Sequence, residues 1–251
     1  MREAVYRKSG LKISHVWFAN NLIRTKSDVT LFHGMESPSQ KINQGGYYEK
    51  VSRQSTLITD LSSDIEALWS SIKKNTRYEI RRAEKEGVTV RFYMGEELPN
   101  ELMDSFERVY NQMYSSKGLT SVFNRKLVNE YCEKGMIAFS IASFQDEPLV
   151  FHSYIYDESN CRFFYSCSPF RDEKEMASLI GRMNRFLHWE DFKFFKEHGI
   201  VEYDWGGINS IEEPNSIAQF KMAFGGAPID RYNYIIANTI KGKIAYLIKY
   251  R

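Results

Sequence analysis

Apolar positions recur with helical spacing in several parts of the chain. In residues 64–86 they return every three or four positions, which predicts a long helix with one buried face and a basic opposite face. Ser63 and Glu66 form an S-x-x-E capping box before this helix, and Gly87 stands where a left-handed residue would end it. Helical spacing predicts four further helices, at residues 101–115, 125–133, 174–197 and 215–223.

Runs of β-branched and aromatic residues predict the strands. Three consecutive runs, 136–144, 148–156 and 161–167, are separated by short polar turns and indicate an antiparallel meander. Other strands are expected within 11–33 and at 55–60, 88–92, 200–205, 233–237 and 244–248, whereas 34–46 has the composition of a long loop. The pattern predicts an α/β fold with a mainly antiparallel sheet flanked by helices.

The composition narrows the classes of protein to which the chain can belong. A 43 % hydrophobic and 26 % charged share is typical of a globular chain, and a net charge of +2 gives no reason to expect a DNA partner. The start lacks an apolar leader, no apolar run is long enough to span a membrane, and the three cysteines form no C-x-x-C pair. We therefore expect a cytoplasmic protein without a transmembrane segment, for which peripheral contact with the inner membrane face stays open.

Two clusters of cationic residues are candidates for binding or catalysis. Arg77 and Arg81 are one helical turn apart and suit a phosphate or carboxylate, or else form surface ion pairs with the neighbouring glutamates. Lys221 lies in the predicted helix 215–223. A fixed ammonium beside a developing oxyanion stabilises acyl transfer by about 3–4 kcal/mol, whereas an exposed lysine would only be solvated.

Other candidates each have a structural alternative. Asp204 ends a predicted strand before Gly206-Gly207, where it would hold an attacking amine or bond the backbone of the turn. Tyr165 would donate to a substrate oxygen or lie in the core, and His188 would act as a base or be structural. The five histidines and three cysteines show no metal-ligand spacing, so we expect no metal site.

Three motifs in this order resemble the FemAB-like family. The first motif consists of Trp69, Ile72, Arg77, Ile80, Arg81, Ala83 and Gly87-Val88. The second consists of Leu187-His188-Trp189 with Tyr203-Asp204-Trp205-Gly206-Gly207, and the third of Ile217, Phe220-Lys221 and Phe224-Gly225-Gly226. The resemblance covers residues 55–228. It implies a GNAT-like fold and transfer of an aminoacyl group, from aminoacyl-tRNA in the best-known members, to an amine of a peptidoglycan precursor. It also implicates Phe220 and Lys221 in catalysis, whereas the alternative for Phe220 is packing in the core. Tyr203, within the second motif, is a further candidate for substrate binding.

The chain departs from the family pattern in two places. Acetyl-CoA-dependent GNAT enzymes usually carry a glycine-rich loop that binds the pyrophosphate. The matching residues 168–175 of this chain contain three acids and no glycine. Only about 55 residues precede the resemblance, so we expect a short, partial N-terminal lobe (1–60) and a GNAT-like domain (61–251). These departures weaken the case for coenzyme A and for tRNA as donors.

Together these observations predict an acyl or aminoacyl transferase that forms an amide on a primary amine of a cell-envelope or glycan precursor. No tightly bound cofactor is expected, and the donor is aminoacyl-tRNA or an acyl-CoA. The alternatives are an acetyl-CoA-dependent N-acetyltransferase acting on an amino sugar, and a non-catalytic GNAT-fold module that binds a glycan or protein.

Overall fold

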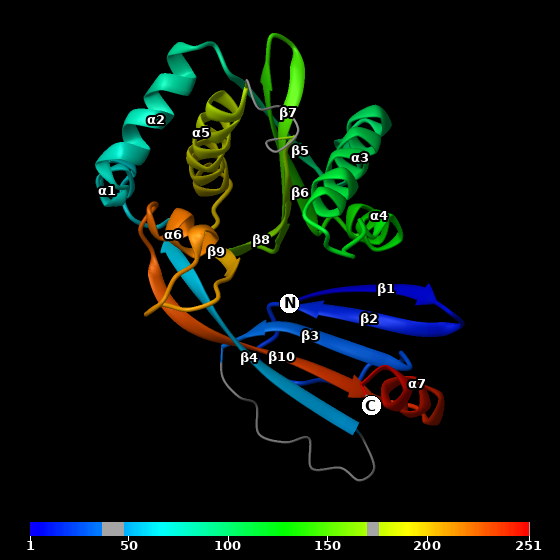
Figure 1. Ribbon diagram of the computed structural model, residues 1–251. Coiled ribbons are helices and arrows are strands. Elements are labelled where there is room, and N and C mark those ends of the chain that lie inside the picture. Colours follow the sequence, from blue (N-terminus) through cyan, green and yellow to red (C-terminus); the bar gives the residue numbers. More distant parts are fainter. Residues whose placement is uncertain (37–47, 170–175, 251) are drawn as a thin grey trace.

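The computed structural model describes residues 1–36, 48–169 and 176–250 (Figure 1). Two predicted segments therefore lie partly outside the described residues: 37–46 of the predicted loop 34–46, and 170–175 of the acidic segment 168–175. The strands are β1 (Arg2–Lys8), β2 (Leu11–Trp17), β3 (Val29–Met35), β4 (Tyr48–Asp60), β5 (Thr89–Met94), β6 (Ile137–Phe144), β7 (Glu147–Tyr156), β8 (Asn160–Cys167), β9 (Glu202–Gly207) and β10 (Ala227–Ala237). The helices are α1 (Ile65–Ser71), α2 (Lys74–Lys85), α3 (Asn100–Ser116), α4 (Arg125–Glu133), α5 (Ala177–Glu197), α6 (Ser216–Met222) and α7 (Ile240–Tyr250), with a 3₁₀ turn at Gly95–Glu97.

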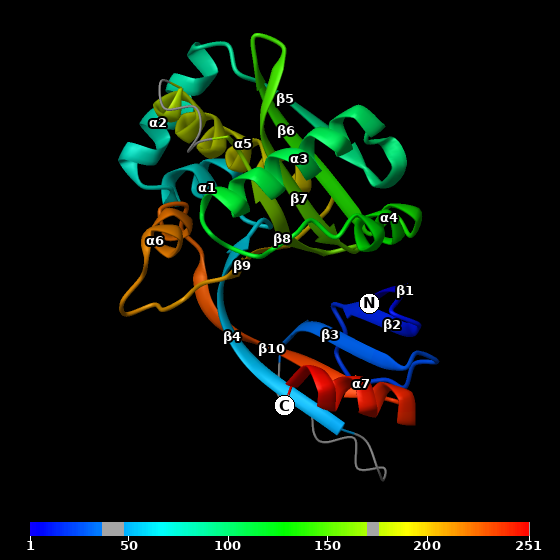
Figure 2. The ribbon, with the colours of Figure 1, turned by 45° about the vertical axis from the view of Figure 1, so that its right-hand side comes forward.

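One mixed sheet connects all of these strands in the order β1-β2-β3-β10-β4-β9-β8-β7-β6-β5. The pairs β2/β3 and β8/β9 are parallel, and the remaining pairs are antiparallel. The long strand β4 pairs with β10 along its length and with β9 at its end, so it links a lower part of the sheet to an upper part (Figure 2). The predicted mixed, mainly antiparallel α/β fold is confirmed.

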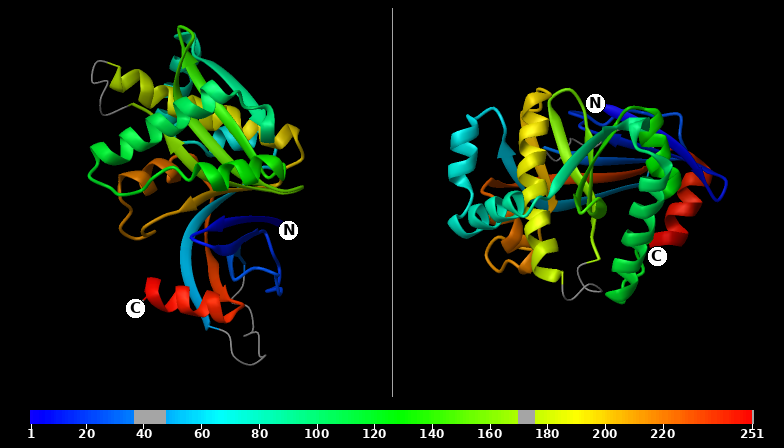
Figure 3. Two further views of the ribbon diagram at one scale, coloured as in Figure 1. Left: turned by 90° about the vertical axis from the view of Figure 1, so that its right-hand side faces the viewer. Right: turned by 90° about the horizontal axis from the view of Figure 1, so that it is seen from above.

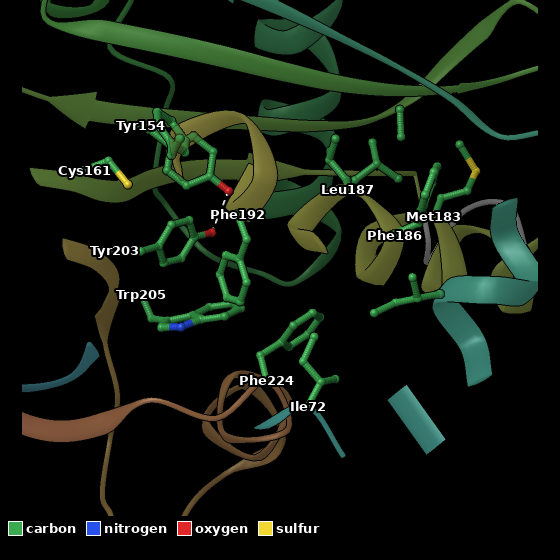
Figure 4. Close-up of a cluster of buried hydrophobic side chains, with 14 of the residues drawn as sticks. Ile72, Tyr154, Cys161, Met183, Phe186, Leu187, Phe192, Tyr203, Trp205 and Phe224 are labelled. Carbon is green, nitrogen blue, oxygen red and sulfur yellow. Dashed lines mark hydrogen bonds between the residues drawn. The ribbon is translucent and has the colours of Figure 1, made fainter. Parts of the chain in front are cut away.

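Helices cover both faces of the upper part of the sheet. Figure 3 shows α5 on one face and α3 on the other, seen from above. One core cluster joins α1, α2, α5 and α6 to the sheet and includes the aromatic group of Tyr154, Phe192, Tyr203, Trp205 and Phe224 (Figure 4). A second cluster joins α3 and α4 to the opposite face and reaches Ala4 and Trp17 of the first two strands. The first cluster surrounds the residues of the family motifs.

The helix predicted over 64–86 is in fact two helices. α1 ends at Ser71, Ile72 and Lys73 have extended backbone, and α2 begins at Lys74. The chain breaks here because α6 docks against it: the Lys73 amide donates to the Ala223 carbonyl oxygen at 2.8 Å, and the Ser71 hydroxyl lies against Phe224. The predicted capping box is also wrong, since Asp64 is the N-cap residue and makes no side-chain capping bond.

Gly225 explains why this docking is close. Its φ is +87°, and a Cβ atom there would lie 2.9 Å from the Ser71 hydroxyl oxygen. A larger residue would therefore be strained in its backbone and would push the α1–α2 junction away. The ring of Trp69 also lies 4.8 Å from that of Trp189 on α5, so all three sequence motifs meet in one region of the fold.

The C-terminal segment predicted as a strand at 244–248 is a helix, α7. Thr239 acts as its N-cap, because its hydroxyl accepts a hydrogen bond from the Gly242 amide at 3.0 Å. Ile240, Ile244, Leu247 and Ile248 share one side of this helix, a spacing that a search for β-rich runs overlooks. No helix in the described ranges is long and apolar enough to cross a lipid bilayer.

Candidate active site

The candidate site lies where β8 and β9 meet. These parallel strands pair only from Asn160 with Glu202 to Arg162 with Asp204, and no pairing follows toward their carboxyl ends. Crevices outside the carboxyl ends of adjacent strands are common ligand sites in α/β sheets. The short helix α6 lies beside this crevice. Its N-cap is Asn215, whose side-chain oxygen accepts a hydrogen bond from the Ala218 amide at 2.9 Å.

Lys221 extends from α6 to the end of β9. Its ammonium donates to the carbonyl oxygens of Gly207 at 2.9 Å and Gly206 at 3.3 Å, and the residue is 9 % exposed. Burial lowers the pKa of Lys221 to about 8; nearby Asp204 opposes this shift, and Arg162 adds to it. A buried cation held by two carbonyl groups is an uncommon feature that typically marks a functional site.

The glycine pair after Asp204 allows this approach. Gly206 has a φ of +69°, and a Cβ atom there would lie 3.0 Å from the carbonyl oxygen of Phe163 and 3.9 Å from the Lys221 Nζ atom. Only glycine therefore fits between β8 and the lysine without strain. This packing explains why the motif Asp204-Trp205-Gly206-Gly207 has a glycine at position 206.

Asp204 is the centre of a buried polar network beside Lys221. Its Oδ1 atom accepts from the Thr56 hydroxyl at 2.6 Å and from the Gly206 amide at 2.8 Å, and its Oδ2 atom accepts from Arg162 at 2.5 Å. The Arg162 guanidinium also donates to the Gln54 side-chain oxygen at 2.9 Å. Asp204 thus accepts a hydrogen bond from the backbone of the turn after its strand, which is the structural alternative given for it above. It also neutralises the nearly buried guanidinium of Arg162.

Arg162 and Asp204 also line a pocket between the upper and lower parts of the sheet. It is partly open to solvent, and Trp17, His33 and Arg231 are among the lining residues. Arg231 forms ion pairs with Glu202 and, at 3.2 Å, with Glu36. Three carboxylates and two guanidiniums therefore line this pocket and give it a formal charge of −1.

Stacked rings form one wall of the pocket. The ring centroids of Trp17 and His33 lie 4.2 Å apart at 19°, and His15 stacks behind His33 at 5.0 Å. The Arg162 guanidinium lies 5.9 Å from the Trp17 ring. Burial, with the nearby His15 and Arg162, holds the pKa of His33 well below its usual range, so His33 is neutral.

A second polar network lies behind the first, inside the aromatic core. The Tyr154 hydroxyl donates to the Asp191 carboxylate at 2.5 Å and contacts the Tyr203 hydroxyl at 2.8 Å, which in turn contacts His188 Nδ1 at 3.1 Å. Because the single Tyr154 proton goes to Asp191, Tyr203 must donate to Tyr154 and His188 must donate to Tyr203. Burial lowers the pKa of His188 well below its usual value, as do His152 and Lys221, so its ring is neutral and Nε2 keeps a lone pair.

The same network contains a group with metal-ligand chemistry. His152, His188 and Asp191 each place a ligand atom within 4.8 Å of one another. Both ring nitrogens of His152 already face partners, Asp191 at 2.9 Å and Asn184 at 2.7 Å. These contacts satisfy the histidine as part of a hydrogen-bond network, and we assign the group no metal.

The structure brings together five of the predicted site residues: Lys221, Phe220, Asp204, Tyr203 and His188. The Phe220 ring lies 5.6 Å from the His188 ring, and the Arg185 guanidinium lies over it at 5.2 Å. Asp204 and Lys221 meet at the end of β9, whereas Tyr203 and His188 belong to the network in the core behind it.

The structure places Tyr165 elsewhere. A register shift leaves Phe164 as an extra residue between the paired positions Phe163 and Tyr165, so the side-chain alternation of β8 changes there. Phe163 remains beside His188, but Tyr165 packs against Tyr110 and Phe123 on the opposite face of the sheet. We leave Tyr165 out of the site proposed below.

Arg77 and Arg81 both lean on Trp69. Arg77 donates to the Trp69 carbonyl oxygen at 3.5 Å, and the Arg81 guanidinium lies 5.1 Å from the Trp69 ring centroid. Arg81 is exposed and Arg77 half-buried, so a polyanion could reach the pair from solvent. Their role in binding stays a prediction.

Sequence reasoning missed Arg162, Thr56 and Gln54. One signal was present: Arg162 is the single charged residue in the otherwise apolar and aromatic run from Cys161 to Tyr165. A lone charge in a central strand indicates a buried partner or a ligand. Thr56 and Gln54 carry no comparable signal, because polar residues are common in a strand with one exposed face.

The chain resembles known proteins in part of its sequence and in its fold. Residues 30–148 match the model of the FemAB family, a range that includes the Trp69–Val88 motif but ends before His188 and Lys221. No curated protein sequence matches the chain. Among solved structures, FemX is similar with a TM-score of 0.63 at 12 % identity, covering 98 % of this chain and 85 % of FemX.

L-PGS from Bacillus licheniformis is also similar, with a TM-score of 0.51 at 14 % identity, covering 88 % of this chain and 72 % of that one. At such low identity these likenesses show the fold alone, and that fold is GNAT-like. Together with the family match, they confirm the resemblance found in the sequence: residues 30–148 match the FemAB family, and the chain has a GNAT-like mixed α/β fold.

Proposed function

We propose that this protein transfers an acyl or aminoacyl group to a primary amine and forms an amide bond, on a precursor of the cell envelope or of a glycan. The observation that carries the proposal is the buried ammonium of Lys221, held at the end of β9 beside a pocket that contains Asp204. The FemAB family match supports it, because that family consists of acyl and aminoacyl transferases.

Lys221 is proposed to stabilise the oxyanion of the tetrahedral intermediate. Two carbonyl groups hold its ammonium in place, so little reorganisation is needed when negative charge develops nearby. The amine nitrogen attacks the donor carbonyl carbon, the carbonyl oxygen becomes the oxyanion, and the bond to the leaving oxygen or sulfur then breaks. The low exposure of Lys221 excludes water and strengthens this charge stabilisation.

The pocket beside Asp204 is proposed to bind the acceptor amine. Its formal charge of −1 favours a cation, and its aromatic wall of Trp17 and His33 offers an apolar surface to the rest of the acceptor. Binding sites of this kind combine an apolar lining with a few polar groups that set the orientation. Asp204 connects the acceptor pocket to the lysine, since it lines the pocket and raises the Lys221 pKa.

His188 is proposed as the base that receives the proton of the attacking amine and returns it to the leaving atom. Its Nδ1–H bond to Tyr203 leaves Nε2 free to accept a proton, and the chain through Tyr154 to the Asp191 carboxylate stabilises the imidazolium that forms. The Lys221 ammonium also contributes to the low pKa of His188.

Replacing Tyr203 with phenylalanine tests this chain of hydroxyl groups. Tyr203→Phe keeps the ring but removes the hydroxyl that joins His188 to Tyr154, so we expect kcat to fall at least about tenfold with KM nearly unchanged. Tyr110→Phe is the matched control, since it also removes a hydrogen-bonded hydroxyl from a core residue, on the opposite face of the sheet. Equal kcat values for the two variants would show that the network is structural.

The donor is proposed to be an aminoacyl ester, as in aminoacyl-tRNA, in preference to acetyl-CoA. Residues 168–175 include Asp172, Glu173 and Glu175 and no glycine, and carboxylates compete with a pyrophosphate for the amides of a helix start. We therefore expect acetyl-CoA to bind with a Kd above about 1 mM in isothermal titration. Micromolar binding would instead favour the N-acetyltransferase alternative.

The proposed function is tested by incubating the protein with aminoacyl-tRNAs or acyl-CoAs and a panel of amine-bearing nucleotide sugars. Mass spectrometry then detects an acceptor whose mass has increased by one acyl or aminoacyl group. Product is expected with the wild-type protein and not with a Lys221 variant. Binding of an acceptor, seen by native mass spectrometry, without product from any donor would favour the non-catalytic binding module.

A further inference from the structure

The C-terminal helix α7 exposes an apolar stripe. The exposed fractions are 76 % for Ile240, 56 % for Ile244, 39 % for Leu247 and 78 % for Ile248. Positions separated by four, seven and eight residues lie on one face of a helix, so the four side chains form a continuous strip. Most exposed aliphatic residues in soluble proteins are scattered, and a contiguous strip indicates a binding surface.

Contacts of α7 with the rest of the protein orient the helix so that the stripe faces outward. Gly242 is buried and lies directly against the chain before β3, where an added Cβ would stand 2.1 Å from the Asp28 carbonyl oxygen. Thr239 caps the helix and donates to the Asp28 carboxylate at 2.7 Å, and Lys241 donates to the Gly10 carbonyl oxygen at 2.5 Å. Thr239, Lys241 and Gly242 therefore hold the helix in place, and the four side chains of the stripe are left outside.

Basic residues gather at the end of the sheet where α7 lies. The register brings the end of β1, the starts of β2, β3 and β4 and the end of β10 to the same end of the sheet, where α7 lies (Figure 1). Among the side chains that the structure describes at this end, Arg7, Lys8, Lys12, Lys50, Lys241 and Lys243 are cationic and Asp28 is acidic. The sequence of α7 itself contains lysines and no acid.

We propose that this end of the molecule binds the surface of an anionic phospholipid membrane, with the α7 stripe inserted among the lipids and the surrounding cations against the headgroups. Helices that lie in a membrane interface combine an exposed apolar face with flanking lysines. Each basic residue near an anionic surface contributes about fivefold to binding. The proposal is independent of the proposed acyl transfer.

Charge and chemistry distinguish the membrane from other occupants. A second copy binding through the same surface in a two-fold dimer would bring two sets of cations together, which is unfavourable. Single-stranded nucleic acid would use the cations, but it stacks on aromatic rings, and the stripe is made of isoleucine and leucine. An anionic lipid surface matches both the cations and the aliphatic side chains.

The proposed geometry leaves the pocket away from the lipids. α7 lies at the Leu11 end of β2, whereas Trp17 at the other end of that strand lines the pocket. Seven residues of strand span roughly 20 Å. The membrane would therefore anchor the protein beside its surface without covering the pocket.

Sedimentation with lipid vesicles tests the proposal on the full chain. Wild-type protein is expected to bind vesicles of equal parts phosphatidylglycerol and phosphatidylcholine at least about tenfold more tightly than pure phosphatidylcholine vesicles, and to dissociate as salt is raised. Ile244→Asn/Ile248→Asn is expected to lose at least about tenfold of this binding. Val122→Asn is the control, because Val122 is 70 % exposed but lies between α3 and α4.

The variants should share one circular dichroism melting curve, since the changed side chains are exposed. Wild-type protein that does not bind the anionic vesicles, or a double variant that binds as well as Val122→Asn, would overturn the proposal. It is also overturned if the double substitution abolishes only a concentration-dependent dimer, or if the protein binds RNA but not vesicles.

Discussion

Lys221→Met is expected to lower kcat by about 10²–10³-fold while leaving the protein at least as stable as the wild type. The loss follows because methionine fills the same space without a charge to stabilise the oxyanion. Stability is maintained because removal of a desolvated ammonium from a site where the residue is only 9 % exposed offsets the loss of its hydrogen bonds to the Gly206 and Gly207 carbonyl groups. Steady-state kinetics and thermal unfolding measure the two effects.

Lys196 offers a matched control for this substitution. Its ammonium also donates to two backbone carbonyl oxygens, those of Leu61 and Ser63, both at 2.9 Å. Neither of these partners lines the pocket. Lys196→Met loses the same number of hydrogen bonds to backbone carbonyl groups and should leave kcat nearly unaltered. Full turnover by Lys221→Met would remove this lysine from the mechanism.

The pH dependence of activity gives a second test of the same role. Burial lowers the Lys221 pKa to about 8, so an oxyanion-stabilising ammonium is present below pH 8 and lost above it. Activity should therefore decline as the pH rises through about 8. A lysine acting as a base would produce the opposite slope.

The same pKa shift links stability to pH. The unfolded chain holds the Lys221 proton up to about pH 10.5, whereas the folded protein releases it near pH 8. Between these values the unfolded state binds more protons, so this group makes the free energy of unfolding rise with pH. Lys221→Met should lack that part of the rise.

Asp204→Asn is expected to destabilise the protein by about 3–5 kcal/mol and to raise KM for the acceptor. The amide keeps the shape of the carboxylate but leaves the Arg162 guanidinium without its countercharge in a nearly buried position. It should also move the alkaline limb of the activity profile to lower pH, because Asp204 raises the pKa of Lys221. Chemical denaturation and pH-dependent kinetics measure the two effects.

A double variant separates stability from function. Asp204→Asn/Arg162→Met removes both buried charges, so it should recover part of the stability lost in the single variant without restoring the acceptor affinity. Glu86→Gln is the comparison, since it breaks the Glu86–Arg182 ion pair between α2 and α5. Normal acceptor affinity in Asp204→Asn would show that this carboxylate only supports the fold.

The sequence by itself determined most of the local structure. The helix predicted at 125–133 has the same bounds as α4, and the three-strand meander is β6, β7 and β8. These elements depend on periodicity and turn residues within one segment, which are visible without a fold. The motif residues Asp204, Gly206 and Lys221 could also be singled out, because their spacing matched a family pattern.

Tertiary structure decided what those residues contact. The break at Ile72–Lys73 exists because α6 docks there, and the extra residue Phe164 turns Tyr165 to the other face of the sheet. The partners of Asp204 come from positions 148 residues away, at Thr56, and 42 away, at Arg162. Local pattern carries no information on such pairs, because it is strand order and register that bring β4, β8 and β9 together and place a buried lysine among them.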